Sequence, residues 1–261
     1  MTSDQQPATL ARKHAPDYTD YTDPIPEGLL AAISNDRCVA LVGAGVTRRC
    51  LSKKRAPLPN WPVLLTDLVS WASERNAITA AEVRDLLELI AKSEFLMVAQ
   101  EMREKLGDES LSIFIADVFD PDAIVPATVH ELLSVVPFRG YITTNYDNLL
   151  ERAYVNVKNR NMERILATEG NRITHLLDSN PFLLKLHGDF NVPSSIVLAH
   201  RDYLRLITDA EYQRLLDNLL SSFTLLIVGY GLTDLDVVLS LDRLAHEGIS
   251  RRHYMLCKRG T

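Results

Sequence analysis

The sequence predicts an α/β fold, in which a mostly parallel sheet is flanked by helices and a helical insertion forms a small second lobe. Short β-branched and aromatic runs alternate with segments whose apolar residues recur at helical spacing, as in parallel sheets. Several runs end directly in glycine or polar residues, as strands do at the ligand-binding edge of such sheets. Residues 61–119 show helical periodicity only. The predicted sheet is therefore of the Rossmann-like kind.

The composition is that of a globular protein with no general affinity for polyanions. The chain has 261 residues, and its 46% hydrophobic content is enough for a substantial core. The formal charge of -6 predicts that neither nucleic acid nor a membrane is a partner. The first residues lack the regions of a signal peptide, and the longest apolar run, near residues 223–228, is too short to span a bilayer. We therefore expect a cytoplasmic protein.

The three cysteines favour neither metal nor disulfide chemistry. Cys38, Cys50 and Cys257 are isolated in the sequence, and no Cys-x-x-Cys pair occurs. Such spacing supports neither a disulfide framework nor a Cys-rich zinc site. The sequence therefore predicts no metal.

The first 25 residues are expected to form a flexible tail, and the domain is expected to occupy residues 26–261. Residues 1–25 are polar and repeat a short Asp-Tyr-Thr unit without a helical or strand period. Leu29, Leu30 and Ile33 then predict a short amphipathic helix. This helix leads into a buried strand at residues 38–42.

The strand at residues 38–42 runs directly into Gly43-Ala44-Gly45. A Gly-x-Gly at this place lets the backbone turn tightly and approach a phosphate, as in dinucleotide sites. Arg48 stands where the full fingerprint has its third glycine, and a tight turn without a ligand explains many such motifs. Of the basic loop at residues 48–55, we expect all but Arg48 to be a solvated flap.

The insertion at residues 61–119 is predicted to consist of helices that pack through apolar stripes. The stripes are Val83, Leu86, Leu87 and Ile90; Phe95, Val98, Ala99 and Met102; and Leu111, Phe114, Ile115 and Val118. They are expected to be core and not a cofactor site. Because the insertion interrupts the alternation of strands and helices, we expect it to pack over the ligand crevice as a lid.

Residues 139–148 are the stretch around which the rest of the chain is expected to be arranged. Tyr141, Ile142 and Thr143 have the character of a buried strand. Side chains just beyond such a strand face the ligand crevice, and this places Asn145 and Asp147 there. Either residue is equally suited to capping the helix that follows, so this stretch alone does not decide between the two interpretations.

The remaining sequence continues the alternation. Helices are predicted around residues 130–136 and 203–220, and strands at residues 165–166, 182–186, 196–198, 223–228 and 254–257. Residues 182–186 run into His187-Gly188-Asp189, and residues 223–228 run into Gly229-Tyr230-Gly231. Asp234 and Asp236 then begin a helix, so this second Gly-x-Gly is expected in the same crevice.

Four strands thus deliver motifs to one edge of the predicted sheet, namely Gly43-Ala44-Gly45, Thr143-Thr144-Asn145-Tyr146-Asp147, Leu186-His187-Gly188 and Gly229-Tyr230-Gly231. This ordered combination resembles the sirtuin superfamily, and more closely the bacterial SIR2-like domains of antiphage defence systems. Residues 58–61 are similar to a segment that those proteins carry after the glycine loop. The chain lacks the four-cysteine zinc module of protein-deacylating sirtuins, and Thr47-Arg48-Arg49 replaces the usual continuation of their glycine motif. Both departures weaken the deacylase interpretation.

The resemblance implies that NAD is bound as the substrate and that its nicotinamide–ribose bond is cleaved. It implies that Asn145 orients the attacking water, and that His187 is a base or a hydrogen-bond partner of the ribose. Asp147 would hold a ribose hydroxyl or stabilise the oxocarbenium-like state. The residues implied in NAD binding are Gly43, Ala44, Gly45, Thr47, Thr144, Gly229, Gly231 and Asp234. A bulky residue at Gly45 or Gly229 is expected to impair binding with little effect on stability.

The expected function is that of an NAD glycohydrolase (NADase) that depletes NAD as the effector of an antiphage defence system. Two alternatives remain open, an NAD-dependent deacylase or ADP-ribosyltransferase and a noncatalytic module that senses NAD or ADP-ribose. Because a constitutive NADase would poison its own cell, we expect a homo-oligomer controlled by a sensor domain or partner protein. The chain stops directly after its last predicted strand, which fits a further domain. The sequence does not indicate whether the ADP-ribose product is linear or cyclic.

Overall fold

A six-stranded sheet lies at the centre of the structure, a computed structural model that describes residues 24–51, 57–119, 124–169, 181–231, 234–248 and 251–257. Its strands are β1 (Cys38–Val42), β2 (Gly140–Thr143), β3 (Glu163–Leu166), β4 (Phe182–Lys185), β5 (Thr224–Val228) and β6 (Tyr254–Leu256). Their order is β3-β4-β2-β1-β5-β6, and every neighbouring pair is parallel. The predicted α/β fold is confirmed.

The central strand, β1, lies between two strands that are distant from it in the sequence. Val42 pairs with Thr143 of β2 on one side and with Val228 of β5 on the other. The three strands therefore end at the same level, and the segments that follow them meet at one edge. The chain continues from β1 toward β2 and from β5 toward β6, in opposite directions across the sheet. Ligands of open α/β sheets bind at such a switch point.

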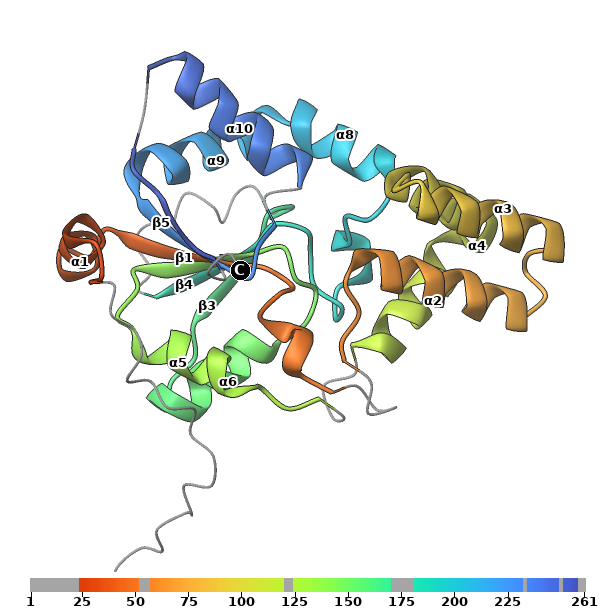
Figure 1. Ribbon diagram of the computed structural model, residues 1–261, viewed down its shortest axis with the longest axis horizontal. Coiled ribbons are helices and arrows are strands. Elements are labelled where there is room, and N and C mark those ends of the chain that lie inside the picture. Colours follow the sequence, from red (N-terminus) through yellow and green to blue (C-terminus); the bar gives the residue numbers. More distant parts are fainter. Residues whose placement is uncertain are drawn as a thin grey trace, which may run out of the picture.

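Helices cover both faces of the sheet (Figure 1). One face carries α5 (Thr128–Val135) and α6 (Leu149–Lys158), and the other carries α8 (His200–Thr208), α9 (Ala210–Ser222) and α10 (Leu235–His246). A short helix, α1 (Glu27–Ser34), precedes β1, and two 3-10 helices are η2 (Thr47–Arg49) and η3 (Pro193–Ser195). This cover explains why the strands are apolar on both sides.

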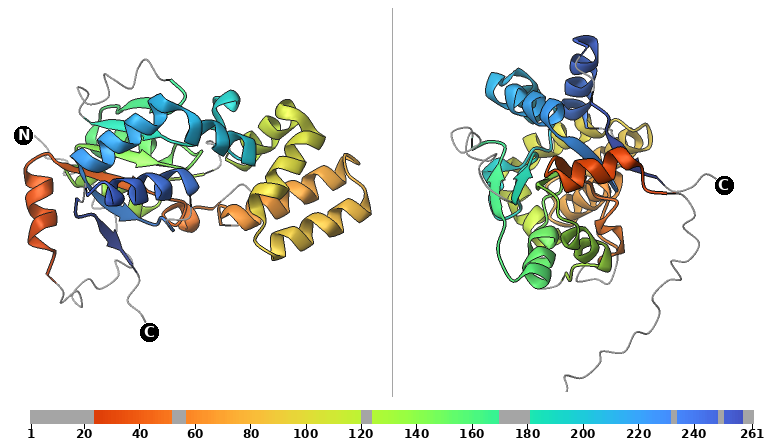
Figure 2. Two further views of the ribbon diagram at one scale, coloured as in Figure 1. Left: turned by 90° about the horizontal axis from the view of Figure 1, so that it is seen from above. Right: turned by 90° about the vertical axis from the view of Figure 1, so that its left-hand side faces the viewer.

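The insertion forms a second lobe of three helices, α2 (Trp61–Glu74), α3 (Ala80–Ala91) and α4 (Phe95–Val118). The lobe lies at the end of the molecule opposite α1 (Figure 2). Asn60 Oδ1 accepts a hydrogen bond from the amide of Val63 at 3.2 Å, and Thr79 and Glu82 form a reciprocal capping box, so the starts of α2 and α3 are fixed locally. Gly107 interrupts α4 with a φ of 72°, which glycine adopts without strain. The predicted helical insertion is confirmed.

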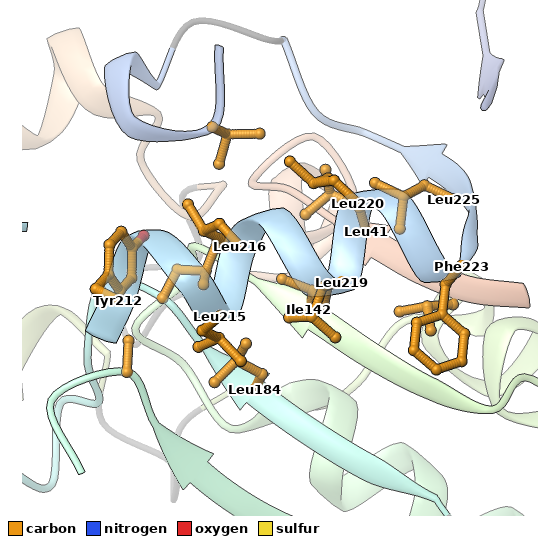
Figure 3. Close-up of a cluster of buried hydrophobic side chains, with 14 of the residues drawn as sticks. Leu41, Ile142, Leu184, Tyr212, Leu215, Leu216, Leu219, Leu220, Phe223 and Leu225 are labelled. Carbon is orange, nitrogen blue, oxygen red and sulfur yellow. The ribbon is translucent and has the colours of Figure 1, made fainter. Parts of the chain in front are cut away.

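One large apolar layer lies under α9. Figure 3 shows Leu215, Leu216 and Leu219 of this helix above the strands of the sheet. The strand residues of the same layer include Leu41, Ile142, Leu184 and Leu225. Burying a leucine side chain stabilises a fold by about 1.5–3 kcal/mol. This layer therefore stabilises the packing of α9 on the strands that carry the site.

The segment at residues 196–198, which the sequence predicts to be a strand, pairs with no strand among the described residues. It is buried, and the amide of Val197 donates a hydrogen bond to His187 O at 3.0 Å. Val197 packs into the layer under α9, whereas Ile196 and Leu198 pack into the core of the second lobe. The apolar run therefore fills the space between sheet and lobe, and the strand prediction is wrong.

The helix predicted at residues 203–220 consists of two helices, α8 and α9. The break occurs at Asp209, whose Oδ1 accepts hydrogen bonds from the amides of Glu211 at 2.8 Å and Tyr212 at 3.0 Å. An aspartate in extended conformation that binds these amides starts a new helix. The apolar periodicity continues across the break, which explains why it predicts a single helix.

Some sequence interpretations fall outside the described residues. These are the predicted tail as far as residue 23, residues 52–56 of the predicted basic flap, and residues 258–261. Among the helices that the structure describes, none has both the length and the apolar character that crossing a bilayer requires.

Candidate active site

A cavity of about 660 Å³ lies at the edge of the sheet where β1, β2, β4 and β5 end. Small-molecule sites typically enclose about 300–1,000 Å³. The sheet side is lined by Ala44, Gly45, Thr47, Arg48, Thr144, Asn145, Tyr146, Asp147, His187, Gly229, Tyr230, Gly231 and Asp234. The second lobe contributes Asn60, Trp61, Phe95 and Phe119 to the other side. The structure thus brings together all of the predicted site residues except Gly43.

The two glycine motifs at this edge interlock through their backbones. Gly45 N donates a hydrogen bond to Gly229 O at 2.7 Å, and a side chain on Gly45 would place its Cβ 2.6 Å from the same oxygen. A Cβ on Gly43 would lie 2.7 Å from Gly229 O and from Tyr230 Cα. Gly229 itself has a φ of 63°, which disfavours a side chain.

These contacts show why small residues are required here, and they correct the expectation for substitutions at Gly45 and Gly229. Gly43 lies behind the cavity surface, where its missing side chain makes room for Tyr230. Substitutions at Gly45 or Gly229 would strain the loops themselves, so an effect on binding alone is not expected.

The loop after β1 turns through η2 and brings Thr47 to the cavity. Thr47 is buried, and both its amide and its Oγ1 donate hydrogen bonds to Ala44 O, at 3.1 and 2.8 Å. Its hydroxyl is therefore committed to the loop. Arg48 is exposed and also lines the cavity. This fits the expectation that Arg48, unlike the rest of the basic loop, is not part of the solvated flap.

The segment after β2 separates the roles of Asn145 and Asp147. Oδ1 of Asp147 accepts a hydrogen bond from the amide of Leu149 at 3.0 Å, so this carboxylate does hold the start of α6. The Asn145 carboxamide, by contrast, binds no protein group within the described part of the chain. The amide N–H of Asn145 donates to Thr143 Oγ1 at 3.1 Å, which fixes its backbone. The capping interpretation thus applies to Asp147 and not to Asn145.

A buried lysine, Lys185 at the end of β4, binds backbone carbonyl groups of the same segment. Its ammonium donates hydrogen bonds to Tyr146 O at 3.1 Å, Asp147 O at 2.6 Å and Asp189 Oδ2 at 2.8 Å. Burial alone would raise the pKa of Asp189, but the ammonium of Lys185 keeps it below its ordinary value. A lysine in an otherwise apolar strand is visible in the sequence, and this is the signal that could have identified it.

His187 follows β4 and is almost completely buried. Its Nε2 lies 3.3 Å from Asp236 Oδ2, and Asp236 is fully buried in the first turn of α10. Tyr212 of α9 donates a hydrogen bond to the same carboxylate. Burial alone would lower the pKa of His187, but the hydrogen bond to Asp236 and the negative charges nearby raise it above its ordinary value.

A second tyrosine and carboxylate lie on the other side of the imidazole. Nδ1 of His187 lies 3.5 Å from the hydroxyl of Tyr203 and 4.0 Å from Asp234 Oδ1. The Tyr203 hydroxyl donates a hydrogen bond to Asp234 Oδ1 at 3.3 Å. The imidazole is therefore flanked by carboxylates on both sides.

Aromatic side chains connect the second lobe to this site. The ring of Trp61 stacks on that of Tyr203, with centroids 6.0 Å apart and an angle of 24°, and it lies 6.3 Å from Phe95. Phe119 makes an edge contact with Tyr146, whose hydroxyl donates to Val197 O at 2.7 Å. The lobe thus supplies an aromatic wall opposite the polar groups of the sheet edge. Such a set of groups suits a ligand with both a ring and several hydroxyl groups.

Among the described residues, no group of three or more His, Cys, Asp or Glu side chains is arranged to hold a metal ion. Cys38 and Cys50 are buried, and Cys257 is exposed. Burial raises the pKa of the Cys38 thiol to about 11, so this residue is a packing group and not a nucleophile.

Sequence reasoning assigned no role to Trp61, Lys185, Tyr203, Tyr212 and Asp236. Tyr203, Tyr212 and Asp236 lie on α8, α9 and α10 and reach the site because these helices pack together. The periodicity of the sequence does not reveal this packing. Asp236 was visible only as an acidic residue near a predicted helix start.

The sequence is similar to several known proteins. Residues 139–261 match the family model of the SIR2-like domain. An NAD(+) hydrolase ThsA of Bacillus cereus (strain MSX-D12) is 35% identical over 133 residues, 50% of this chain and 28% of the relative. An NAD(+) hydrolase ThsA of Cytobacillus dafuensis is 26% identical over 228 residues, 86% of this chain and 42% of the relative. Defense-associated sirtuin 2 of Bacillus subtilis is 27% identical over 164 residues, 58% of this chain and 15% of the relative. The chain thus spans less than half the length of each of these curated relatives.

The family match begins after β1, but the domain cannot begin there. β1 is the strand that joins β2 to β5, so residues 139–261 alone would leave a gap in the middle of the sheet. The similarity to the Cytobacillus dafuensis protein, which covers 86% of this chain, includes residues ahead of that match. The parallel sheet, the four motifs at its edge and these similarities agree with one another. Residues 139–261 thus match the SIR2-like domain family, and the longer similarity to the Cytobacillus dafuensis protein extends this likeness toward the first strands of the sheet.

Proposed function

We propose that this protein is an NAD glycohydrolase, which uses water to cleave the nicotinamide–ribose bond of NAD and releases nicotinamide and ADP-ribose. The main supporting observation is that the carboxamide of Asn145, which has no partner among the described residues, and the imidazole of His187 line one cavity at the edge of the sheet. Two of the relatives are named NAD(+) hydrolases, which supports NAD as the substrate.

Cleavage of the nicotinamide–ribose bond needs no general acid. The nicotinamide of NAD is a cationic pyridinium, and it leaves as a neutral molecule, so no side chain has to protonate it. The site must hold the ribose while positive charge develops on it and must place a water at the anomeric carbon. Two catalytic carboxylates of the kind that ordinary glycosidases use are not needed. One water is consumed and one proton is released.

Asn145 is assigned to the attacking water, because its carboxamide has no protein partner among the described residues. The amide oxygen accepts a hydrogen bond from the water and orients it toward the anomeric carbon. Thr143 fixes the backbone of Asn145, and Lys185 fixes the two carbonyls that follow. This rigid presentation matters because orientation lowers the barrier without requiring tighter binding.

His187 is assigned to the ribose as a hydrogen-bond donor. Its sequence interpretation left open a base or a hydrogen-bond partner. The neighbours of the imidazole favour a donor, since Asp236 lies beside Nε2 and the Tyr203 hydroxyl and Asp234 lie beside Nδ1. Asp147 and Asp234 line the same cavity, and their negative charge favours the oxocarbenium-like state. The glycine loops at Gly45 and Gly229 are assigned to the diphosphate, with Ala44, Thr47, Thr144 and Gly231 beside them.

The NAD cleavage is proposed to serve antiphage defence by depleting the NAD of the cytoplasm. Support comes from the relative named defense-associated sirtuin 2 and from the SIR2-like family itself. Since an unrestrained NADase is toxic to its own cell, we propose that activity depends on homo-oligomerisation and on a sensor domain or partner protein.

Incubation of the purified protein with NAD, analysed by mass spectrometry, tests the reaction. Free nicotinamide and ADP-ribose without any acceptor are expected. Turnover only with an acyl peptide or protein acceptor would indicate a deacylase or transferase, and binding without turnover would indicate a sensor.

Asn145→Ala is expected to reduce turnover by about 100-fold or more while leaving much of the NAD affinity. Asn148→Ala is the matched control, because Asn148 lies on the same segment, makes no side-chain cap and does not line the cavity. Equal turnover in the two variants would remove Asn145 from the catalytic group.

The dependence on assembly is tested by measuring NAD cleavage over a range of protein concentrations, together with the mass by light scattering. Activity is expected to rise with the fraction of higher assemblies. A stable monomer with full activity at every concentration would contradict this proposal.

A further inference from the structure

Five side chains from four parts of the chain form one buried polar group around His187. Asp236 comes from α10, Tyr212 from α9 and Tyr203 from α8, while Asp234 directly precedes α10. His187, Tyr212 and Asp236 are each almost or completely buried. Polar side chains that share a buried site must satisfy one another's hydrogen bonds, so their donors and acceptors can be assigned together.

The assignment starts at Asp236, because a buried ionised carboxylate can only accept. Tyr212 donates a hydrogen bond to this carboxylate. Burial alone would raise the pKa of Asp236, but its contacts with His187 and Tyr212 keep that pKa below its ordinary value. Nε2 of His187, 3.3 Å from this carboxylate, must therefore carry a hydrogen whether the imidazole is charged or neutral. Nδ1 is then the nitrogen that gains or loses the proton.

The position of the two nitrogens relative to the cavity follows from their neighbours. Asp236, beside Nε2, is fully buried and is not part of the cavity surface. Tyr203 and Asp234, beside Nδ1, both line the cavity. The nitrogen that titrates is thus the one on the side where a ligand binds.

We propose that Asp236 is a positioning residue for His187. It accepts the Nε2 hydrogen, and Tyr212 holds its carboxylate in place, so that Nδ1–H is directed at the cavity as a donor. With His187 protonated, the donors form one consistent chain, from His187 Nδ1–H to the Tyr203 oxygen and from the Tyr203 hydroxyl to Asp234. A ligand hydroxyl can replace Tyr203 as the acceptor.

The charges that face His187 support this protonation. Asp236 and Asp234 are the carboxylates beside it, and Tyr203 and Tyr212 are the hydroxyl groups. The hydrogen bond with Asp236 and both negative charges outweigh the effect of burial and raise the pKa of His187. The catalytic consequence, donation to the ribose of NAD, rests on the proposed function, whereas the orientation of the imidazole does not.

The test is nuclear magnetic resonance of the protein with 15N-labelled histidine, recorded over a range of pH without NAD. His187 is identified by the signal that His187→Gln lacks. In the parent, neutral His187 is expected to keep its proton on Nε2. In Asp236→Asn this preference should be lost and the pKa of His187 should fall. Asp242→Asn is the matched control, since Asp242 is an exposed carboxylate on the same helix, and it should leave the titration unchanged.

Activity provides an independent measurement. With NAD as substrate, Asp236→Asn is expected to lower kcat by about tenfold or more with little change in KM, because orientation is lost and contacts to the substrate are kept. Tyr212→Phe removes the hydroxyl that holds the carboxylate and should shift the His187 titration in the same direction to a smaller extent. This second variant decides the question if Asp236→Asn does not fold.

The outcomes separate this proposal from the proposed function. A parent in which neutral His187 carries its proton on Nδ1, or an Asp236→Asn variant with the parental titration, would overturn the positioning role even if NAD is cleaved. A shifted titration in a protein that does not cleave NAD would support the positioning role and overturn the proposed reaction.

Discussion

Lys185 offers the sharpest test of how the site is held together, because removing one buried ammonium should loosen the segment that presents Asn145. The side chain is fully buried, and its three acceptors are two carbonyls of that segment and the carboxylate of Asp189. The perturbation is Lys185→Met, which keeps an unbranched side chain that is one heavy atom shorter and removes its charge and its donors.

The expected cost follows from the partners that remain. Removing one member of a buried ion pair costs about 3–5 kcal/mol, because the other charge stays buried without compensation. Asp189 keeps the guanidinium of Arg164 at 2.8 Å and the amide of Asn191 at 2.9 Å. Glu151, whose Oε1 lies 3.6 Å from the ammonium, also loses this cation, so the expected loss of unfolding free energy is about 3–5 kcal/mol.

The pH dependence of this loss has a defined sign. The pKa of Asp189 is below its ordinary value, so its contribution to stability is present above the unfolded pKa of about 3.9. This contribution disappears as the pH falls through the folded value. The difference in stability between the parent and Lys185→Met should therefore narrow on acidification.

Urea unfolding at pH 7, followed by circular dichroism, measures the effect. The midpoint should fall while the slope with urea stays constant. Lys92→Met is the control, since it removes the same group from an exposed ion pair with Glu88 and should leave the midpoint unchanged. Adding Asp189→Asn to Lys185→Met should restore part of the loss. A loss of less than about 1 kcal/mol would refute the conclusion that the ammonium holds this segment.

Two further predictions concern the glycine loops and the imidazole. Gly45→Ala should lower the thermal midpoint, because its Cβ would meet the backbone oxygen of Gly229 at 2.6 Å, and an unchanged melting curve would contradict the interlock. The raised pKa of His187 stabilises the fold below the unfolded value of about 6.5, and this stabilisation is lost as the pH rises through the folded value. As the pH rises above about 6.5, the thermal midpoint of the parent should therefore fall more steeply than that of His187→Gln. Parallel plots of thermal midpoint against pH for the two proteins would show that His187 does not titrate as inferred.

The sheet could be predicted from the sequence because parallel strands buried on both faces appear as continuous apolar runs. Residues 38–42 illustrate this, since the predicted strand and β1 coincide. Residues 196–198 show the limit. Their apolar run is equally buried, but burial arises there from the packing of the second lobe and not from strand pairing. A local pattern reports burial and does not identify the partner.

The cavity could be predicted for a similar reason, since the ends of neighbouring parallel strands must meet. This places Asn145 and His187 together without knowledge of any helix position. The carboxylate that faces His187 could not be assigned in the same way. Asp236 and Tyr212 meet only because α9 and α10 pack side by side on one face of the sheet, and the sequence pattern does not determine that contact.

The central position of β1 also has a consequence for the synthesis of the protein. β1 is apolar throughout and, among the described strands, pairs only with β2 and β5, the second of which follows β2, β3 and β4 in the sequence. At about 5–20 residues per second, a ribosome exposes β1 for on the order of ten seconds before β5 emerges. Until then the edge of β1 that pairs with β5 stays open, even after β2 has been made, and an unpaired apolar edge is prone to associate with other chains. The order of strands that creates the cavity therefore makes folding depend on long-range pairing, which is slow.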